Sequence, residues 1–133
     1  MIIDAKDLIL GRVATFAAKQ ALLGEEVTII NAEKAVISGN KADIFKKYYR
    51  RDNLGYALKG PYLPKTSYMF VKRVIRGMLP YKNYRGKEAL KRIKCYPGNP
   101  SNVKGETIKL AQYQNLKKIK FVTIAEVCKY LKK

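Results

Sequence analysis

The chain has 133 residues and a formal net charge of +18, from 28 Lys and Arg against ten Asp and Glu. Its length fits one domain, and its 47% of hydrophobic residues can supply a real core, so the composition excludes a chain that is disordered throughout. So large an excess of positive charge is unusual for a soluble enzyme, because it makes the protein repel itself.

The first forty residues predict a βαβ unit. Apolar runs of strand length occur at 2–3 and 27–30, and the apolar positions within 13–21 fall on one helical face between them. Gly24 follows the last of these positions, where a glycine commonly ends a helix. The compact spacing predicts two parallel strands joined by a right-handed crossover, and a further short strand is expected at 35–37.

A second helix is predicted to begin after Asn40 and to run through Tyr49. Asn40 and Asp43 resemble an N-cap pair, and the residues that follow are alternately apolar and basic. The inner stripe of this helix is predicted to contain Ile44, Phe45, Tyr48 and Tyr49. Glycines and prolines within 52–66 then predict an ordered loop rather than a helix or strand.

Two further helices are predicted in the middle of the chain. Apolar residues recur at helical spacing from Phe70 to Met78, and Gly77 and Pro80 should end that helix. A shorter helix is expected at 85–93. Its inner face would contain Ala89, Leu90 and Ile93, and a strand is expected to follow at 94–96.

The C-terminal part predicts turns and one more helix. Residues 97–102 (PGNPSN) form a turn cluster, and 109–119 are too weakly periodic to assign. An extended piece is expected at 121–122. Thr123 and Glu126 form a capping box, which predicts a short final helix. We therefore expect one domain over 1–133.

The positive charge is concentrated in one segment of the chain. Residues 41–94 hold 16 Lys and Arg but only three acids, and so carry +13 of the total +18. A basic segment of this kind inside a foldable chain indicates a polyanionic partner, because neutralising phosphates releases condensed counterions. We call residues 41–94 the basic segment.

The tyrosines of the basic segment favour RNA as that partner. Seven of the ten tyrosines lie there among Lys and Arg. Tyrosine can stack on an unpaired base or hydrogen-bond a phosphate, and Arg can bridge phosphate oxygens, which suits folded RNA. Tyr48 and Tyr49 are the exceptions, because their helical spacing predicts core positions. A membrane surface would need a free apolar helix face, whereas the Phe70–Met78 stripe has other elements to pack on.

Motifs for enzyme chemistry are missing from the sequence. There is no G-x-G-x-x-G or phosphate-loop motif, and Gly11 is interpreted instead as a residue that allows close helix packing. The chain has no His, so the commonest general base is absent. Cys95 and Cys128 are interpreted as small buried hydrophobes. We expect no catalytic residue, cofactor, metal or small-molecule substrate. The alternative function is that of an enzyme of nucleotide or RNA metabolism, whose basic surface would attract its substrate.

The N-terminal sequence MIIDAKD lacks the basic and then apolar pattern of a signal peptide. No apolar run approaches the roughly 20 residues needed to cross a bilayer. We therefore expect a cytoplasmic protein without a membrane partner.

Three segments resemble one protein family. They are 4–14, with Asp4-Ala5 and LGRVA; 27–41, VTIINAEKAVISGNK; and 76–94, RGMLPYKNYRGKEALKRIK. They are similar to the universal ribosomal protein thirteen of the large subunit, and their sequence resembles its archaeal branch more than its bacterial or eukaryotic branches. The resemblance implies a three-layer α/β/α fold with a parallel sheet of about four strands. It also implies a structural role on large-subunit (23S-type) rRNA beside neighbouring ribosomal proteins.

The candidate RNA-binding residues come from the family motifs and from the basic segment. The motifs imply Arg12, the Asn40-Lys41 helix start, Arg76, Lys82, Arg85 and Gly86. The basic segment adds Lys46, Lys47, Arg50, Arg51, Lys65, Arg73, Lys87, Lys91 and Arg92. The family often has Arg followed by Ala-Pro where this chain has Lys65-Thr66-Ser67. Lys65 stays a candidate, although a Lys cannot bridge two phosphate oxygens as an Arg can.

Overall fold

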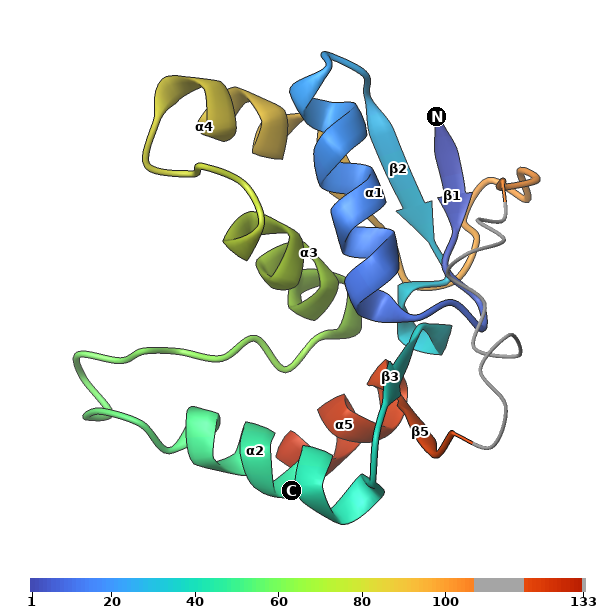
Figure 1. The fold of residues 1–133 in the computed structure, drawn as a ribbon. Helices are drawn as coiled ribbons and strands as arrows, with labels where there is room; N and C mark the ends of the chain where they lie inside the picture. Colours follow the sequence, from blue (N-terminus) through green and yellow to red (C-terminus); the bar gives the residue numbers. More distant parts are fainter. Residues whose placement is uncertain (107–118, 133) are drawn as a thin grey trace.

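Two parallel strands and the helix between them organise the first part of the chain. The computed structural model describes residues 1–106 and 119–132. It places β1 (Ile2–Asp4), α1 (Leu10–Leu22) and β2 (Val27–Ile30) in the predicted βαβ order, with β1 and β2 parallel (Figure 1). Gly24 ends the helical region with φ +100°, a conformation that glycine adopts readily. The predicted βαβ unit is confirmed.

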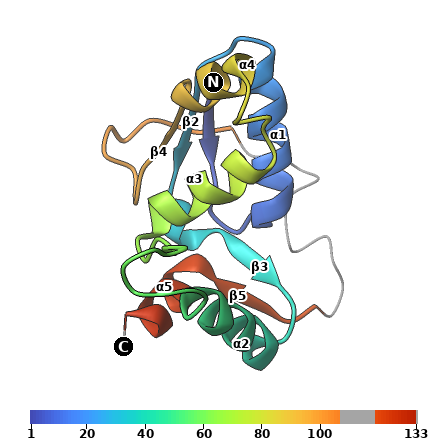
Figure 2. The same cartoon turned by 90° about the vertical axis from the view of Figure 1, so that its left-hand side faces the viewer.

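A third strand, β4 (Ile93–Cys95), pairs in parallel with β2, so the sheet order is β1-β2-β4. The register places five buried side chains on one face of this sheet: Ile3, Val27, Ile29, Ile93 and Cys95. Helices α1 and α3 (Ser67–Gly77) lie along the same side and contact each other (Figure 2). This layer of apolar side chains between sheet and helices is the main core, and the predicted α/β class is confirmed.

The resemblance implied about four parallel strands and three layers. The parallel sheet has three strands in the described part of the chain, and Glu106 adds a single parallel bridge beside Ile3. The other face of the sheet carries residues such as Thr28 and Lys94. There the structure places side chains of the segment 96–103, at the position where the resemblance implies a third layer.

A second, smaller sheet lies below the first in Figure 1. β3 (Val36–Ser38) pairs antiparallel with β5 (Phe121–Thr123), after a short 3₁₀ helix η1 (Ala32–Lys34). Helices α2 (Lys41–Asp52) and α5 (Ile124–Leu131) contact this sheet and each other. The predicted capping box is confirmed, because the Thr123 hydroxyl accepts a hydrogen bond from the Glu126 backbone N–H at 3.4 Å.

Aromatic contacts connect α2 to its neighbours. The buried ring of Tyr48 meets Phe70 of α3 edge-on at 5.1 Å between centroids, and Phe45 stacks on Tyr130 of α5 at 4.5 Å. Tyr48 is therefore a core residue, as predicted. The prediction for Tyr49 was wrong: its side chain is 57% exposed and meets only the edge of Tyr130.

Three predictions need correction in the middle of the chain. Met78 is 43% exposed rather than on the inner stripe, because α3 ends one residue earlier. Helix α4 (Tyr84–Lys91) is shorter than predicted, so Ile93 begins β4 instead of ending a helix. Gly11 does not allow close helix packing, since a Cβ there would meet nothing within 4 Å.

Both cysteines are buried and free, which agrees with their interpretation as small hydrophobes. Burial raises the pKa of the Cys95 thiol to about 11 and also raises the pKa of Cys128. Both thiols therefore stay protonated near neutral pH, which makes them poor nucleophiles. Among the described residues, no helix is long and apolar enough to span a membrane.

The start of α3 generates a stability prediction. Thr66 precedes the helix in an extended conformation (φ −101°, ψ 136°), and Ser67 is the first helical residue. Proline suits that position, because its φ is already helical and the residue before it must be extended. Ser67→Pro should raise the free energy of unfolding by about 0.5–1 kcal/mol in urea denaturation.

Lys72→Pro is the matched control, because proline inside a helix should cost about 3 kcal/mol. If the Ser67→Pro variant unfolds at a lower urea concentration than the parent protein, α3 does not begin at Ser67.

Candidate nucleic-acid interface

The outward face of α2 carries one group of basic side chains. Lys46, Lys47, Arg50 and Arg51 are all exposed there, as the sequence predicts. The Lys47 ammonium and the Arg51 guanidinium lie 5.9 Å and 5.6 Å from the centre of the Tyr48 ring. Burial raises the pKa of the Tyr48 phenol, while the charge of Arg51 acts in the opposite direction. We call these four cations the α2 group.

The connection between α3 and α4 carries a second group. Lys82, Arg85 and Lys87 are exposed on and just after this turn. The turn is fixed by backbone hydrogen bonds, including one of 2.8 Å from the Tyr81 N–H to the Leu79 carbonyl, and the Leu79 side chain is buried. We call these three cations the turn group; the fold holds them in place through buried contacts on either side.

Gly86 has a packing role in the same turn. It is buried, and a Cβ at this position would lie 2.1 Å from the Pro80 carbonyl oxygen. The chain can approach itself so closely only without a side chain. The sequence motif marked Gly86 as an RNA contact, and the structure gives it a reason to be glycine that needs no RNA.

Three predicted arginines contact other parts of the protein. The Arg73 guanidinium donates a hydrogen bond to the Tyr62 carbonyl, and Arg92 donates one to the Ala21 carbonyl at 3.2 Å. Both side chains are half-buried, so these two candidates are less exposed to RNA than the other candidate cations. Arg76 is exposed, and its guanidinium lies 5.2 Å from the centre of the Tyr81 ring.

Three predicted lysines form ion pairs with carboxylates. Their N–O distances are 3.8 Å for Lys41–Glu126, 3.2 Å for Lys65–Asp52 and 2.8 Å for Lys91–Glu88. A hydrogen bond between Lys91 and Glu88 lowers the pKa of the carboxyl and raises the pKa of the ammonium. These are the three ion pairs between side chains in residues 1–106 and 119–132, so most of the basic segment has no carboxylate partner there.

The remaining two candidates lie at helix starts. Arg12 is exposed in the first turn of α1, at the end of that helix away from α4 (Figure 1). Asn40 is exposed at the N-cap position of α2, but its side chain makes no capping hydrogen bond. The structure therefore gathers seven of the sixteen candidates into the α2 and turn groups, and leaves Arg12 apart from them.

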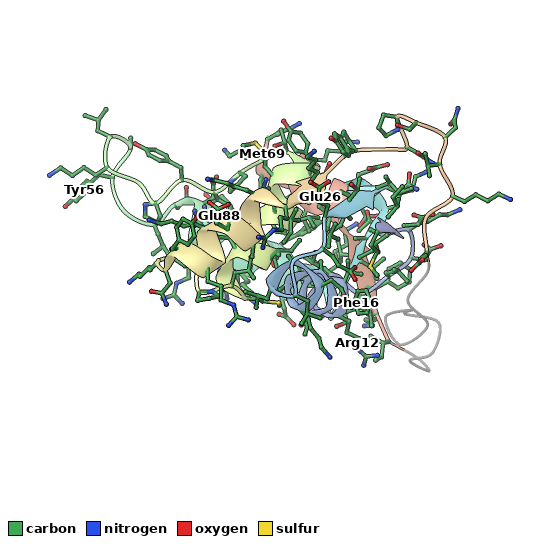
Figure 3. The ribbon with its side chains drawn as sticks, turned by 90° about the horizontal axis from the view of Figure 1, so that it is seen from above. Arg12, Phe16, Glu26, Tyr56, Met69 and Glu88 are labelled. Atoms are coloured by element: carbon green, nitrogen blue, oxygen red, sulfur yellow. The ribbon has the colours of Figure 1, made fainter. Side chains whose placement is uncertain are left out.

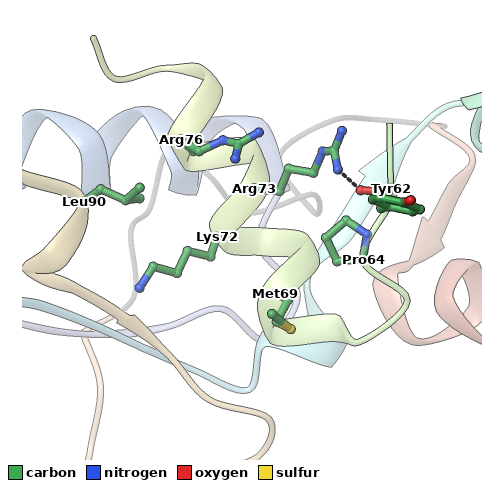
Figure 4. A pocket seen from close by; sticks show the side chains of 7 residues that line it. All are labelled: Tyr62, Pro64, Met69, Lys72, Arg73, Arg76 and Leu90. Carbon is green, nitrogen blue, oxygen red and sulfur yellow. Dashed lines mark hydrogen bonds between the residues drawn. The ribbon is translucent and has the colours of Figure 1, made fainter. Parts of the chain in front are cut away.

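The loop predicted at 52–66 lies between α2 and α3, but the sequence did not indicate that it projects from the protein. Tyr56 is 80% exposed and Leu58 is 94% exposed near its tip, which Figure 3 shows standing away from the body of the protein. Where this loop returns to α3, a hollow of about 340 Å³ opens beside the helix (Figure 4). Its lining residues are Tyr62, Pro64, Met69, Lys72, Arg73, Arg76 and Leu90. We call it the α3 pocket.

Two acidic residues near the N-terminus, Asp4 and Glu33, accept hydrogen bonds within the fold. The Asp4 carboxylate accepts hydrogen bonds from the Asn31 side chain at 2.9 Å and from the Lys6 backbone at 3.0 Å. The Glu33 carboxylate accepts one from the Gly98 backbone at 2.9 Å. Over the described residues, no group of three or more His, Cys, Asp or Glu is placed to hold a metal ion.

Comparisons with known proteins agree with the sequence motifs. The family model described as "Ribosomal protein L13" matches residues 1–102. A protein of Halobacterium salinarum named "Large ribosomal subunit protein uL13" is 45% identical over 131 residues, covering 98% of this chain and 90% of the relative. The Methanosarcina barkeri protein of the same name is 48% identical over 130 residues, covering 95% and 93%. The Thermoplasma volcanium one is 45% identical over 131 residues, covering 98% and 96%.

The fold and the composition define a small α/β protein with a large excess of positive charge. The match over most of the chain then identifies the family: this chain belongs to the ribosomal protein L13 family. The resemblance drawn from the three sequence segments is confirmed, including its similarity to archaeal members.

Gly86 provides a test of the turn geometry. Gly86→Ala should lower the free energy of unfolding by about 1–3 kcal/mol, because the added Cβ meets the Pro80 carbonyl and the turn must move. The matched control is Gly77→Ala, where a Cβ meets nothing within 4 Å and alanine should be neutral or slightly stabilising. Urea denaturation of both variants measures the difference; equal stabilities would contradict the close approach.

Proposed function

We propose that this chain is a structural constituent of the large ribosomal subunit and that its basic segment binds large-subunit rRNA. Membership of the ribosomal protein L13 family supports the first part. The observation that carries the second is the exposed cations of the α2 and turn groups, which have no ion-pair partner in the described structure.

The two groups offer RNA different kinds of contact. The α2 group is a row of charges along a helix face, which suits successive phosphates of an RNA backbone. The turn group is held by buried residues on either side, so its charges need little ordering when RNA binds. Arg12, Asn40 and the ion-paired lysines are further proposed RNA contacts, and neighbouring ribosomal proteins are further proposed partners.

The alternative, an enzyme of nucleotide or RNA metabolism, has no support from the family to which the chain belongs. The chain also lacks His, and the carboxylates of Asp4 and Glu33 are used in hydrogen bonds within the fold. We therefore assign the positive surface to stable RNA binding rather than to attraction of a substrate that reacts.

Affinity for large-subunit rRNA should fall steeply with salt. If about six phosphates are neutralised, the dependence known for duplex DNA predicts a loss of about 10³-fold between about 50 mM and 200 mM salt. Filter binding to the rRNA fragment that the chain protects from nuclease measures this slope. A flat response would show that phosphate contacts do not dominate.

The turn group should matter more than its share of the charge. Arg85→Ala with Lys87→Ala should weaken rRNA binding and incorporation into the large subunit, while thermal unfolding of the free protein stays nearly unchanged. Lys129→Ala with Lys132→Ala is the matched control, because it removes two exposed charges from α5 and its C-cap. If both double variants bind equally, or if the first unfolds early and binds normally once folded, the turn is not an RNA contact.

A further inference from the structure

The α3 pocket combines apolar walls with cations. Its volume of about 340 Å³ lies at the lower end of the range for small-molecule sites, roughly 300–1,000 Å³. Three of the seven lining residues are Lys or Arg, and none is acidic. The electrostatic character of the pocket is therefore suited to an anionic group of modest size.

The apolar walls include surface that the fold leaves uncovered. The Tyr62 side chain is 65% exposed and the Met69 side chain is 50% exposed, while Pro64 and Leu90 are half-buried. Figure 4 shows Tyr62 and Pro64 on the loop side of α3, with Met69 on the first turn of the helix. A flat aromatic base could cover these groups, because base stacking on aromatic and apolar side chains tolerates any base.

The three cations of the pocket make different contacts within the protein. Arg73 is committed to the Tyr62 carbonyl and so fastens the loop to α3. Arg76 lies over the Tyr81 ring, which leaves the edge of its guanidinium available to an anion. Lys72 lies one turn away from Arg76 on the same helix. Figure 4 shows these two side chains extending in different directions, so Arg76 and Lys72 are suited to separate phosphates.

The loop side of the pocket is already shaped in the free protein. The Tyr62 hydroxyl donates a hydrogen bond to the Ala57 carbonyl at 2.9 Å, and the Gly60 N–H donates one to the Tyr56 carbonyl at 2.9 Å. A Cβ at Gly55 would lie 1.9 Å from the Gly60 carbonyl oxygen, so the two arms of the loop approach closely. Tyr62 is therefore positioned before any ligand arrives, which lowers the entropy cost of binding.

We propose that the α3 pocket receives a single unpaired nucleotide of the bound rRNA. The base stacks against Tyr62 and Met69, its phosphate is bound by Arg76, and Lys72 is left to bind a neighbouring phosphate of the RNA. This inference rests on the proposed function and adds to it a nucleotide-sized recognition site, distinct from the phosphate contacts of the α2 and turn groups.

The decisive variant is Met69→Glu, which places a carboxylate in the pocket. Position 69 is in the first turn of α3, where an acidic residue favours the helix, so the fold should not suffer. Ala125→Glu is the matched control: it adds the same charge at an exposed position in the first turn of α5. Met69→Glu should weaken binding to the nuclease-protected rRNA fragment by about tenfold or more, and Ala125→Glu by less than about twofold. Equal effects of the two variants would overturn the inference.

Ultraviolet crosslinking of large subunits that contain the chain identifies the contact directly. Peptides that include Tyr62 or Met69 should crosslink to one unpaired rRNA nucleotide, which should become reactive to base-specific chemical probes in Met69→Glu subunits. Free AMP or UMP should displace the nuclease-protected rRNA fragment from the isolated protein only weakly, because the site recognises a nucleotide held within RNA.

The outcomes separate this inference from the proposed function. If the chain assembles into large subunits but crosslinks only through other residues, such as Tyr84, the pocket assignment is wrong and the proposed function stands. Tight binding of the free mononucleotide would reassign the pocket to a small-molecule ligand. If the chain neither sediments with large subunits nor binds their rRNA, the proposed function fails first.

Discussion

Repulsion among the positive charges of residues 41–94 is the constraint on which the rest of the structure depends. The described residues contain no buried charged or polar side chain, so the charges must be borne on the surface. Three ion pairs there involve only three of the 28 Lys and Arg side chains of the chain, whose net charge is +18. The isolated fold therefore retains an electrostatic cost, and a polyanion that neutralises these charges stabilises the folded state as it binds.

The fold keeps the unpaired positive charges on its surface, where RNA can reach them. The parallel sheet and helices α1 and α3 bury an apolar core that contains no charge, and the Tyr48–Phe70 contact fastens α2 to it. Cations near backbone carbonyls, such as Arg73 and Arg92, strengthen the scaffold rather than the binding surface. The exposed cations of α2 and of the turn are consequently presented from elements whose geometry is set by the core.

Local patterns in the sequence were sufficient for the βαβ start, the α3 stripe and the final helix, because periodicity and capping residues are local properties. Tyr49 could not be placed this way: two adjacent aromatic residues cannot both face the core fully, and the ring beside Tyr49 comes from Tyr130, which is distant in sequence. Met78 was misplaced because the helical period was continued past the end of α3. The α3 pocket leaves no local signal, because it forms where the 52–66 loop meets α3, and the Gly86–Pro80 approach depends on the backbone path of the turn, which the motif alone does not specify.

The most direct test of this account is the melting temperature of the free protein as NaCl is raised from about 0.01 M to about 0.15 M. Over this range the screening length falls from about 30 Å to about 8 Å, so repulsion between unpaired surface charges is weakened. The account predicts that the melting temperature rises, because the folded state holds these charges closer together than the unfolded chain does. A melting temperature that falls or stays constant would show that the positive charges are already balanced within the fold, and would contradict the central claim.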